Sequence, residues 1–217
     1  MIEAGRAGPA RALPLRPFAL VVVATALAGV AGGVALHRLR AAPTPVAPAL
    51  PELHGQVVWA PGARPAPSFT LRDQRGASVA LGALRGRPVL LTFLGSRCGS
   101  GCAPEALRLA SVLRRLPVAE RPTLVIVSLD PQGDTPVAID RAVRRWGLGG
   151  GPQWHWLTAS RARLTSVWRM YGVPAGSAHR LRIFLIDGRG DERTAYLFPF
   201  MPAFVEGDLA RLAGEHA

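Results

Sequence analysis

The feature that most constrains this sequence is a pair of cysteines placed directly after an apolar run. Residues 88–94 are apolar apart from Thr92, and Cys98 and Cys102 follow them with three residues in between. An uninterrupted apolar run of this length is typical of a strand that is covered on both faces of a sheet. A helical pattern begins near residue 103. We therefore expect both sulfurs in one loop between a buried strand and a helix.

These two cysteines are the only ones in the chain. Two thiols in one loop can cycle between dithiol and disulfide, or they can hold a soft metal ion such as Cu(I). The alternative is a structural disulfide, or two unrelated buried thiols. A cysteine in a core needs no partner on the same turn, so the spacing favours a functional pair.

The rest of the folded part alternates strand and helix patterns. Thr135 is the expected N-cap of one helix, with Pro136 at its first position. Parallel units at the start and an antiparallel pair at the end predict an α/β fold, in which a mixed central sheet has helices on both faces. The pattern predicts a hairpin over 68–84, strands over 88–94, 123–129, 155–158, 181–186 and 194–198, and helices over 103–116, 135–146, 160–171 and 207–213.

The N-terminal region is predicted to be separate from this domain. Residues 17–36 form an uncharged stretch of twenty residues, which at ~1.5 Å per residue matches a hydrocarbon core of roughly 30 Å. We expect a transmembrane anchor there, with residues 1–16 in the cytoplasm. The alternative is a cleaved signal peptide, because Ala26-Leu27-Ala28 has the small-x-small pattern of a cleavage site. Either interpretation exports the remainder.

A proline-rich linker is expected over residues 37–66, followed by the folded domain over residues 67–217. Proline recurs every few residues from Ala41 to Pro67, which is typical of an extended, semi-rigid spacer. The apolar triplet Val57-Val58-Trp59 is expected to contact the domain.

The formal charge of +12 comes entirely from arginine, because the chain has no lysine. The arginines are scattered and form no run interleaved with aromatic residues, so we expect no nucleic-acid binding. The positive field favours acidic partners or anionic lipid head groups.

Several segments of the folded part form a recognisable set. The cysteine pair in C-x-x-x-C spacing is one landmark, and His179, followed by an apolar strand and an Asp-Gly turn, is another. The full set comprises residues 67–76, 86–93, 98–102, 127–136, 156–158, 167–173 and 179–188. Together these segments, from about residue 67 to residue 198, resemble the SCO/SenC family of copper-handling proteins of cytochrome oxidase assembly, which have a thioredoxin-like fold.

The resemblance implies that Cys98, Cys102 and His179 bind one copper ion. Thiolates suit Cu(I), and an added imidazole allows Cu(II) as well. The implied function is a copper chaperone that loads the CuA site of a terminal cytochrome c oxidase, with the oxidase's copper-binding subunit as partner. The implied location is the bacterial inner membrane, where a single-pass protein, expected to be a monomer, exposes its C-terminal domain to the periplasm.

The sequence also departs from the family pattern. Gly99 and Ala103 stand where relatives usually have proline, and Ala178 precedes the histidine where an acidic residue is usual. Arg180 and Arg182 flank His179, and arginines nearby disfavour a dication. These departures favour the alternative that Cys98 and Cys102 are the catalytic redox pair of a membrane-anchored thiol–disulfide oxidoreductase that reduces the oxidase subunit's cysteines. A copper or redox sensor is a third hypothesis.

Other polar residues near the pair have expected supporting roles. Arg97 and the start of the following helix are expected to stabilise a thiolate, with Cys98 the more exposed sulfur. Asp130 and Asp134 are expected to order their loop and cap a helix, and Glu105 to favour the first turn of its helix electrostatically. His54 and His155 are not expected to be functional.

Overall fold

The structure, a computed structural model, describes residues 52–98, 101–149, 153–174 and 182–215. In these ranges no helix combines the length and the apolarity that a membrane crossing requires. The expected anchor over residues 17–36, the expected spacer up to residue 51 and His179 lie outside the described residues.

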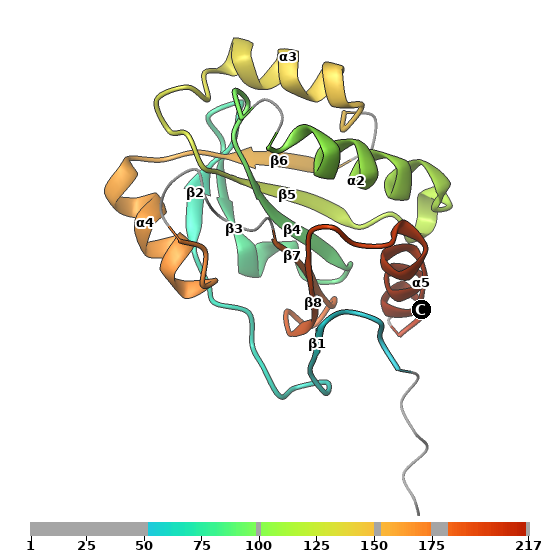
Figure 1. Ribbon diagram of the computed structural model, residues 1–217. Helices are drawn as coiled ribbons and strands as arrows, with labels where there is room; N and C mark the ends of the chain where they lie inside the picture. The colour runs from blue at the N-terminus through green and yellow to red at the C-terminus, as the bar shows by residue number, and fades with distance from the viewer. Residues whose placement is uncertain (1–51, 99–100, 150–152, 175–181, 216–217) are drawn as a thin grey trace, which may run out of the picture. The chain divides into compact units, whose positions relative to one another are not determined.

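A mixed six-stranded sheet organises the described chain, with β4 and β5 near its middle (Figure 1). Every residue of β4 and β5 is buried, as the two apolar runs predict. β4 pairs in parallel with β5, with Leu91 opposite Val125, and antiparallel with β7, with Thr92 opposite Ile183. The strand order is β1 (Val57–Val58), β8 (Glu192–Leu197), β7 (Arg182–Ile186), β4 (Val89–Leu94), β5 (Thr123–Ser128) and β6 (Trp154–Leu157).

This topology brings chemistry-bearing segments to one end of the sheet. The chain leaves β4 and β5 at their carboxyl ends, and because β7 is antiparallel to β4, β7 begins at that same end. β8 is antiparallel to β7 and ends there. The cysteine loop, the loop after β5, the start of β7 and the segment after β8 therefore share this end.

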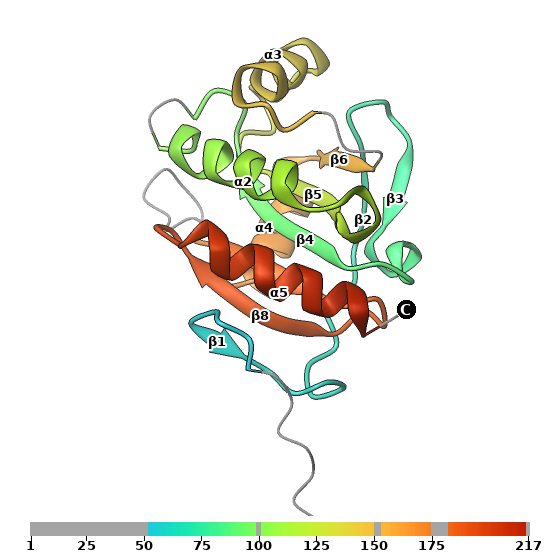
Figure 2. The ribbon, with the colours of Figure 1, turned by 90° about the vertical axis from the view of Figure 1, so that its right-hand side faces the viewer.

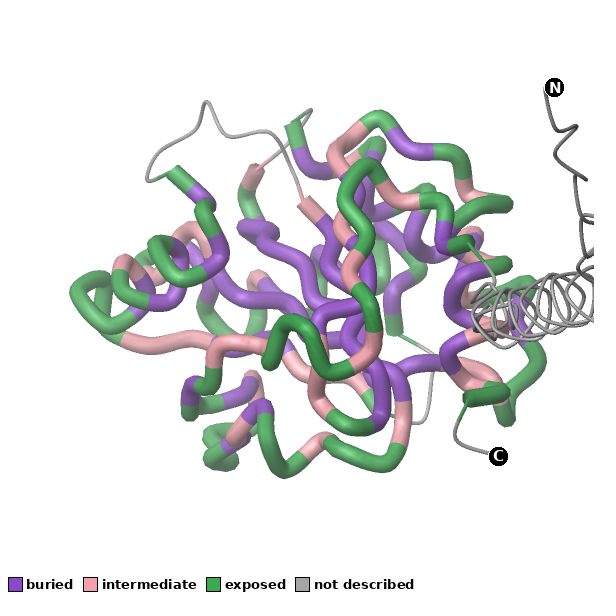
Figure 3. The backbone as a smooth tube through the Cα atoms, turned by 90° about the horizontal axis from the view of Figure 1, so that it is seen from below, coloured by how far each residue is buried: buried purple, intermediate pink, exposed green. Residues whose placement is uncertain are grey.

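Helices cover both faces of the sheet, as expected. One face carries α2 (Ala103–Arg115), α3 (Pro136–Trp146) and α5 (Pro202–Gly214), with α5 lying along β8 (Figure 2). The other carries α4 (Arg161–Met170) and the hairpin of β2 (Thr70–Arg72) and β3 (Ser78–Ala80). Two short 3-10 helices span Leu81–Leu84 and Val118–Glu120. In space, the buried residues gather along the central strands, and the exposed residues lie around them (Figure 3).

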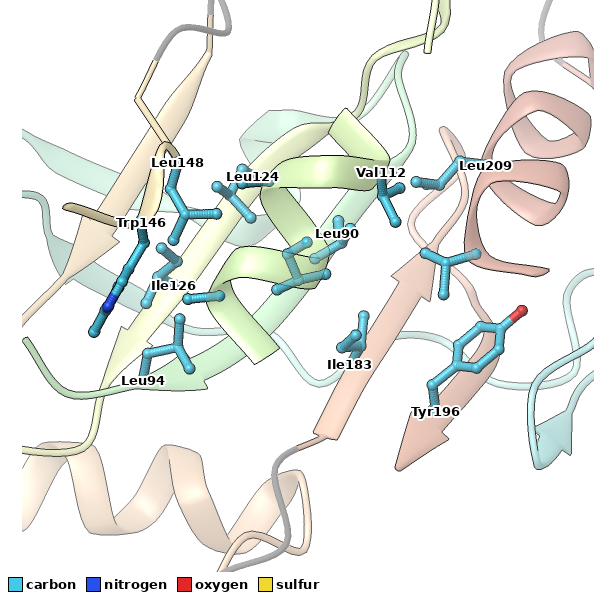
Figure 4. Close-up of a cluster of buried hydrophobic side chains, with 14 of the residues drawn as sticks. Leu90, Leu94, Val112, Leu124, Ile126, Trp146, Leu148, Ile183, Tyr196 and Leu209 are labelled. Carbon is cyan, nitrogen blue, oxygen red and sulfur yellow. The ribbon is translucent and has the colours of Figure 1, made fainter. Parts of the chain in front are cut away.

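The larger apolar core lies between the sheet and the helices α2, α3 and α5 (Figure 4). Leu90, Leu94, Leu124 and Ile126 alternate along β4 and β5 and project into it. Alternate residues of the same strands enter the second core against α4. Because residues along a strand point to opposite faces, two continuously apolar strands supply both cores at once.

The helix signals are confirmed in α3. The Thr135 side chain accepts a hydrogen bond from the Ala138 N–H at 3.3 Å, and Pro136 occupies the first turn. Gly147 closes the helix with a φ of 68°, in the left-handed region that favours glycine.

The predicted starts of the last helix and of β8 are wrong. The last helix begins at Pro202, five residues before the predicted residue 207. Val205, Leu209 and Leu212 are buried at helical spacing, and the prolines before them hid this start. β8 begins at Glu192 rather than at residue 194, because a bulge lets Glu192 pair with Ile186.

The chain from residue 52 to residue 66 packs on the domain. β1 pairs with β8, which confirms the expected contact of Val57-Val58-Trp59. His54 binds the buried Asp208 of α5, with 2.8 Å between Nδ1 and Oδ1. The folded unit extends from Pro51 to Ala217, so part of the segment expected as linker belongs to it.

Candidate functional site

Cys98 and Cys102 form a disulfide, with their Cα atoms 5.5 Å apart. Cys102 is the N-cap residue of α2, and its carbonyl accepts a hydrogen bond from the Ala106 N–H at 2.9 Å. Cys102 is fully buried, whereas Cys98 is partly exposed. The expectation that Cys98 is the more exposed sulfur is confirmed, because Cys102 lies where the first turn of α2 enters the core.

Asp134 holds the residues before Cys98 in place. The Ser96 N–H donates to Asp134 Oδ1 at 2.7 Å, and Ser128 Oγ and Trp156 Nε1 donate to Oδ2 at 2.6 and 2.9 Å. The carboxylate is buried and links the ends of β4, β5 and β6. Asp134 therefore orders the loop, as expected, but the helix cap is Thr135.

Arg97 and Asp130 form an exposed ion pair beside Cys98, with 3.0 Å between Nη2 and Oδ2. Gly133 lies under this pair, and a Cβ there would come within 1.9 Å of Asp130 Oδ2 and 2.1 Å of Arg97 Nε. A larger residue at position 133 would therefore have to displace these two side chains. The positive charge that the sequence places next to Cys98 is thus offset by a carboxylate.

Glu105 corrects a sequence expectation. Its side chain is fully buried and not on the helix surface, and Thr92 Oγ1 donates to its Oε1 at 2.8 Å. The other carboxyl oxygen is buried without a hydrogen-bond partner. Burial raises the pKa of the Glu105 carboxyl to about 8, although the Thr92 hydrogen bond works in the opposite direction. Because the group is largely protonated at neutral pH, it adds little charge to the helix start.

Sequence reasoning missed the pairing of Thr92 with Glu105. A signal was present, because Thr92 is the one polar residue of its apolar strand and Glu105 stands three residues after Cys102. Residues three apart lie on the same helix face. Cys102 and Glu105 therefore share one face of α2, and the packing of that face on β4 is what buries them.

Among the described residues, no group of three or more His, Cys, Asp or Glu side chains is arranged to hold a metal ion. The structure brings Cys98 and Cys102 together, and it describes no position for His179. It does place Arg182, three residues after His179, at the start of β7. The next residue, Ile183, pairs with Thr92 of β4, the strand that leads to Cys98.

The two histidines within the described residues, His54 and His155, pair with carboxylates and do not contact the cysteines. His155 lies 3.3 Å from the buried Asp73 of the hairpin turn, measured from Nδ1 to Oδ2. His54 stacks on Phe204, with ring centroids 4.8 Å apart, in addition to its contact with Asp208. These contacts are structural and fasten a hairpin and an N-terminal segment to the domain.

Comparison with known proteins identifies the family. The protein-family model described as SCO1/SenC matches residues 60–196. No curated protein sequence matches the chain.

Solved structures share the fold. A copper-bound ScoI of Arabidopsis thaliana has a TM-score of 0.58 at 20% identity, covering 69% of this chain and 98% of its own. A copper-bound ScoI of Bradyrhizobium japonicum has a TM-score of 0.53 at 22% identity, covering 68% and 98%. Yeast Sco1 has a TM-score of 0.60 at 19% identity, covering 72% and 98%.

Proposed function

The chain belongs to the SCO1/SenC family, and from this membership we propose that it is a copper chaperone of cytochrome c oxidase assembly. Its cargo binds through Cys98 and Cys102 after their disulfide is reduced, and through His179. The observation that carries the proposal is the cysteine pair at one end of the sheet, within the residues that match the family. The recipient is the CuA site of a terminal oxidase.

The donor set suits the cargo. Two thiolates are soft ligands that favour Cu(I), and one imidazole extends the site to Cu(II). Three protein ligands leave a position for a ligand of the recipient, which transfer requires. The backbone separation of 5.5 Å between the two Cα atoms places both sulfurs within reach of one ion.

The sheet topology supports a role for His179. Arg182 opens β7 at the same end of the sheet where β4 leads into the cysteine loop. Three residues span at most about 10 Å of extended chain, so His179 is tethered to that end. The proposal requires the imidazole to reach the sulfurs from there.

The test is anaerobic Cu(I) binding by the purified, reduced protein. We expect one tightly bound copper per chain, and loss of that binding by at least about tenfold in His179→Ala, Cys98→Ser and Cys102→Ser. His216→Ala is the matched control, because His216 lies outside the residues that match the family. Tight binding that all three ligand variants retain would overturn the proposal.

A second candidate function is thiol–disulfide exchange with the oxidase subunit. It is favoured by the contrast between a partly exposed Cys98 and a fully buried Cys102. The Cys98 thiolate would attack a partner disulfide, forming a mixed disulfide and releasing one partner thiolate. The Cys102 thiolate would then attack Cys98 sulfur, release the second partner thiolate and leave the Cys98–Cys102 disulfide.

Cys102→Ser distinguishes this second function. The variant should accumulate a mixed disulfide with an oxidised peptide that carries the recipient's cysteine pair, whereas Cys98→Ser should not. If the mixed disulfide does not accumulate while the wild type still binds copper, the exchange function is excluded and only the chaperone function remains.

For location, we propose that residues 17–36 anchor the chain in a bacterial inner membrane, with the domain in the periplasm. The support is the length and uncharged character of that segment. A reporter enzyme that is active only outside the cytoplasm should be active when it is fused after residue 217, whereas a reporter that is active only in the cytoplasm should not. The protein should also resist extraction from membranes by carbonate. A soluble, exported product would favour a cleaved signal peptide.

A further inference from the structure

A hollow lies on the sheet face that carries α4. It has a volume of about 440 Å³ and is bordered by β1, β7, β8 and the end of α4, all labelled in Figure 1. This volume is within the range of small-molecule sites. Neither cysteine lines it.

The interior of this cavity is apolar and aromatic. Phe184 and Tyr171 are buried in its wall, with ring centroids 5.1 Å apart. Val57 and Met170 also line it, although their side chains are 46% and 40% exposed. Exposed apolar side chains beside a hollow gain from an apolar ligand, because the ligand removes their surface from water.

Three arginines line the same cavity, and no acidic residue does so among the described residues that border it. Arg64 pairs with the buried Glu192 and stacks over Trp59, so its charge is already balanced. Arg169 and Arg182 have no carboxylate partner within the described part of the chain.

Arg182 is the more constrained of these two cations. Its Nη1 reaches the Tyr171 carbonyl only at 3.5 Å, and its Nε is buried without a hydrogen-bond partner. The Arg182 guanidinium therefore lacks part of its hydrogen bonds, and an anion that accepts from its other N–H groups would stabilise it. A carboxylate suits guanidinium groups best, since two parallel N–H donors match its two oxygens.

We propose that this cavity binds an amphipathic carboxylate, with its apolar body against Tyr171, Phe184 and Met170 and its head between Arg169 and Arg182. The observations favour a small molecule, because four elements converge on a hollow rather than present a flat face. The same chemistry is offered by a free alkyl carboxylate and by the anionic end of a lipid, and the experiment separates these sources.

The test uses the full chain and calorimetric titration with decanoate below its micelle concentration. We expect saturable binding of one decanoate, with decanol and decyltrimethylammonium binding at least about tenfold more weakly. Arg182→Gln and Arg169→Gln should each weaken decanoate binding by about tenfold. Arg145→Gln, an exposed arginine of α3, should leave it unchanged.

Met170→Glu provides a second variant in case Arg182→Gln does not fold, because Met170 is exposed. It places a negative charge at the cavity and should abolish binding, whereas Val137→Glu, at a position 68% exposed on α3, should not. Equal affinity for decanoate and decanol, or wild-type affinity in both Met170→Glu and Arg169→Gln, would overturn the proposal.

A parallel arm measures binding to phosphatidylglycerol and phosphatidylcholine vesicles. If the ligand is a lipid, Arg169→Gln should weaken binding to phosphatidylglycerol vesicles relative to the wild type and leave phosphatidylcholine binding unchanged. If it is a free carboxylate, the variant should differ only in decanoate binding. If Arg169→Gln changes neither decanoate binding nor vesicle binding, the proposal is contradicted. A urea unfolding titration of each variant checks that it is folded.

Discussion

The two halves of the Cys98–Cys102 disulfide lie in regions of opposite character. Cys98 follows a loop fixed by Asp134, whose carboxylate accepts three hydrogen bonds from β4, β5 and β6 or the residues that follow them. Cys102 begins a helix turn that is buried and poor in hydrogen bonds. There Glu105 accepts one hydrogen bond from Thr92, and its other carboxyl oxygen has no partner. Both acids are buried, but Asp134 accepts three hydrogen bonds whereas Glu105 accepts one, so the two regions differ in how far their buried carboxyl groups are satisfied.

The largest expected effect comes from removing the satisfied acid. Asp134→Ala leaves the Ser96 N–H, the Ser128 hydroxyl and Trp156 Nε1 without their acceptor. We expect a loss of about 4 kcal/mol in the free energy of unfolding, measured by urea titration, because each orphaned buried donor costs about 1–3 kcal/mol. Asp140→Ala, in an exposed ion pair of α3, is the control and should change stability by less than about 0.5 kcal/mol. Equal effects of the two variants would remove the distinction between the regions.

The Glu105 carboxyl, in contrast to that of Asp134, is expected to destabilise the folded protein when it is charged. Its pKa rises from 4.5 to about 8 on folding. The unfolded chain therefore releases this proton at lower pH than the native protein does. The stability associated with this group is fully present below pH 4.5 and is lost as pH rises to about 8.

Glu105→Gln should remove that loss. Relative to the wild type, the oxidised variant should gain on the order of 5 kcal/mol in unfolding free energy between pH 4.5 and pH 8, and the gain should accrue roughly evenly over this range. Urea titrations at several pH values measure it, and Glu206→Gln, which removes a half-buried acid of α5 that pairs with Arg115, serves as control. A difference between variant and wild type that does not change with pH would show that Glu105 titrates normally.

The exposure of the two sulfurs gives a smaller, kinetic difference. In the single variants Cys102→Ala and Cys98→Ala, the remaining thiol is Cys98 or Cys102, respectively. We expect a maleimide to label Cys98 at least about tenfold faster than Cys102, because Cys102 is fully buried. Labelling in denaturant should equalise the rates. Equal rates in the native proteins would mean that the first turn of α2 opens readily.

The smallest effect is expected at the exposed ion pair. Arg97→Gln removes the partner of Asp130, and we expect less than about 0.5 kcal/mol of destabilisation, since exposed pairs contribute little. Arg144→Gln, which breaks the exposed pair with Asp140, is the matched comparison. A much larger loss at Arg97 would mean that the loop before Cys98 depends on this pair as well as on Asp134.

The sequence by itself determined the elements and the position of the cysteine pair. Continuous apolar runs predicted β4 and β5, Thr135 and Pro136 predicted the start of α3, and the spacing after β4 predicted a loop that carries both sulfurs. These features are local, because periodicity and capping act within a few residues along the chain.

Only the tertiary structure decided the state of the polar groups. Glu105 at a helix start reads as a surface acid, and it became a buried, largely protonated group because α2 packs that face on β4. Residues 52–66 read as spacer, yet β1 joins the sheet through β8, more than 130 residues away in sequence. Arg169 and Arg182 became one cavity wall only when α4 and β7 met. Such outcomes depend on contacts between distant segments, and burial and hydrogen-bond supply are set by those contacts rather than by residue type.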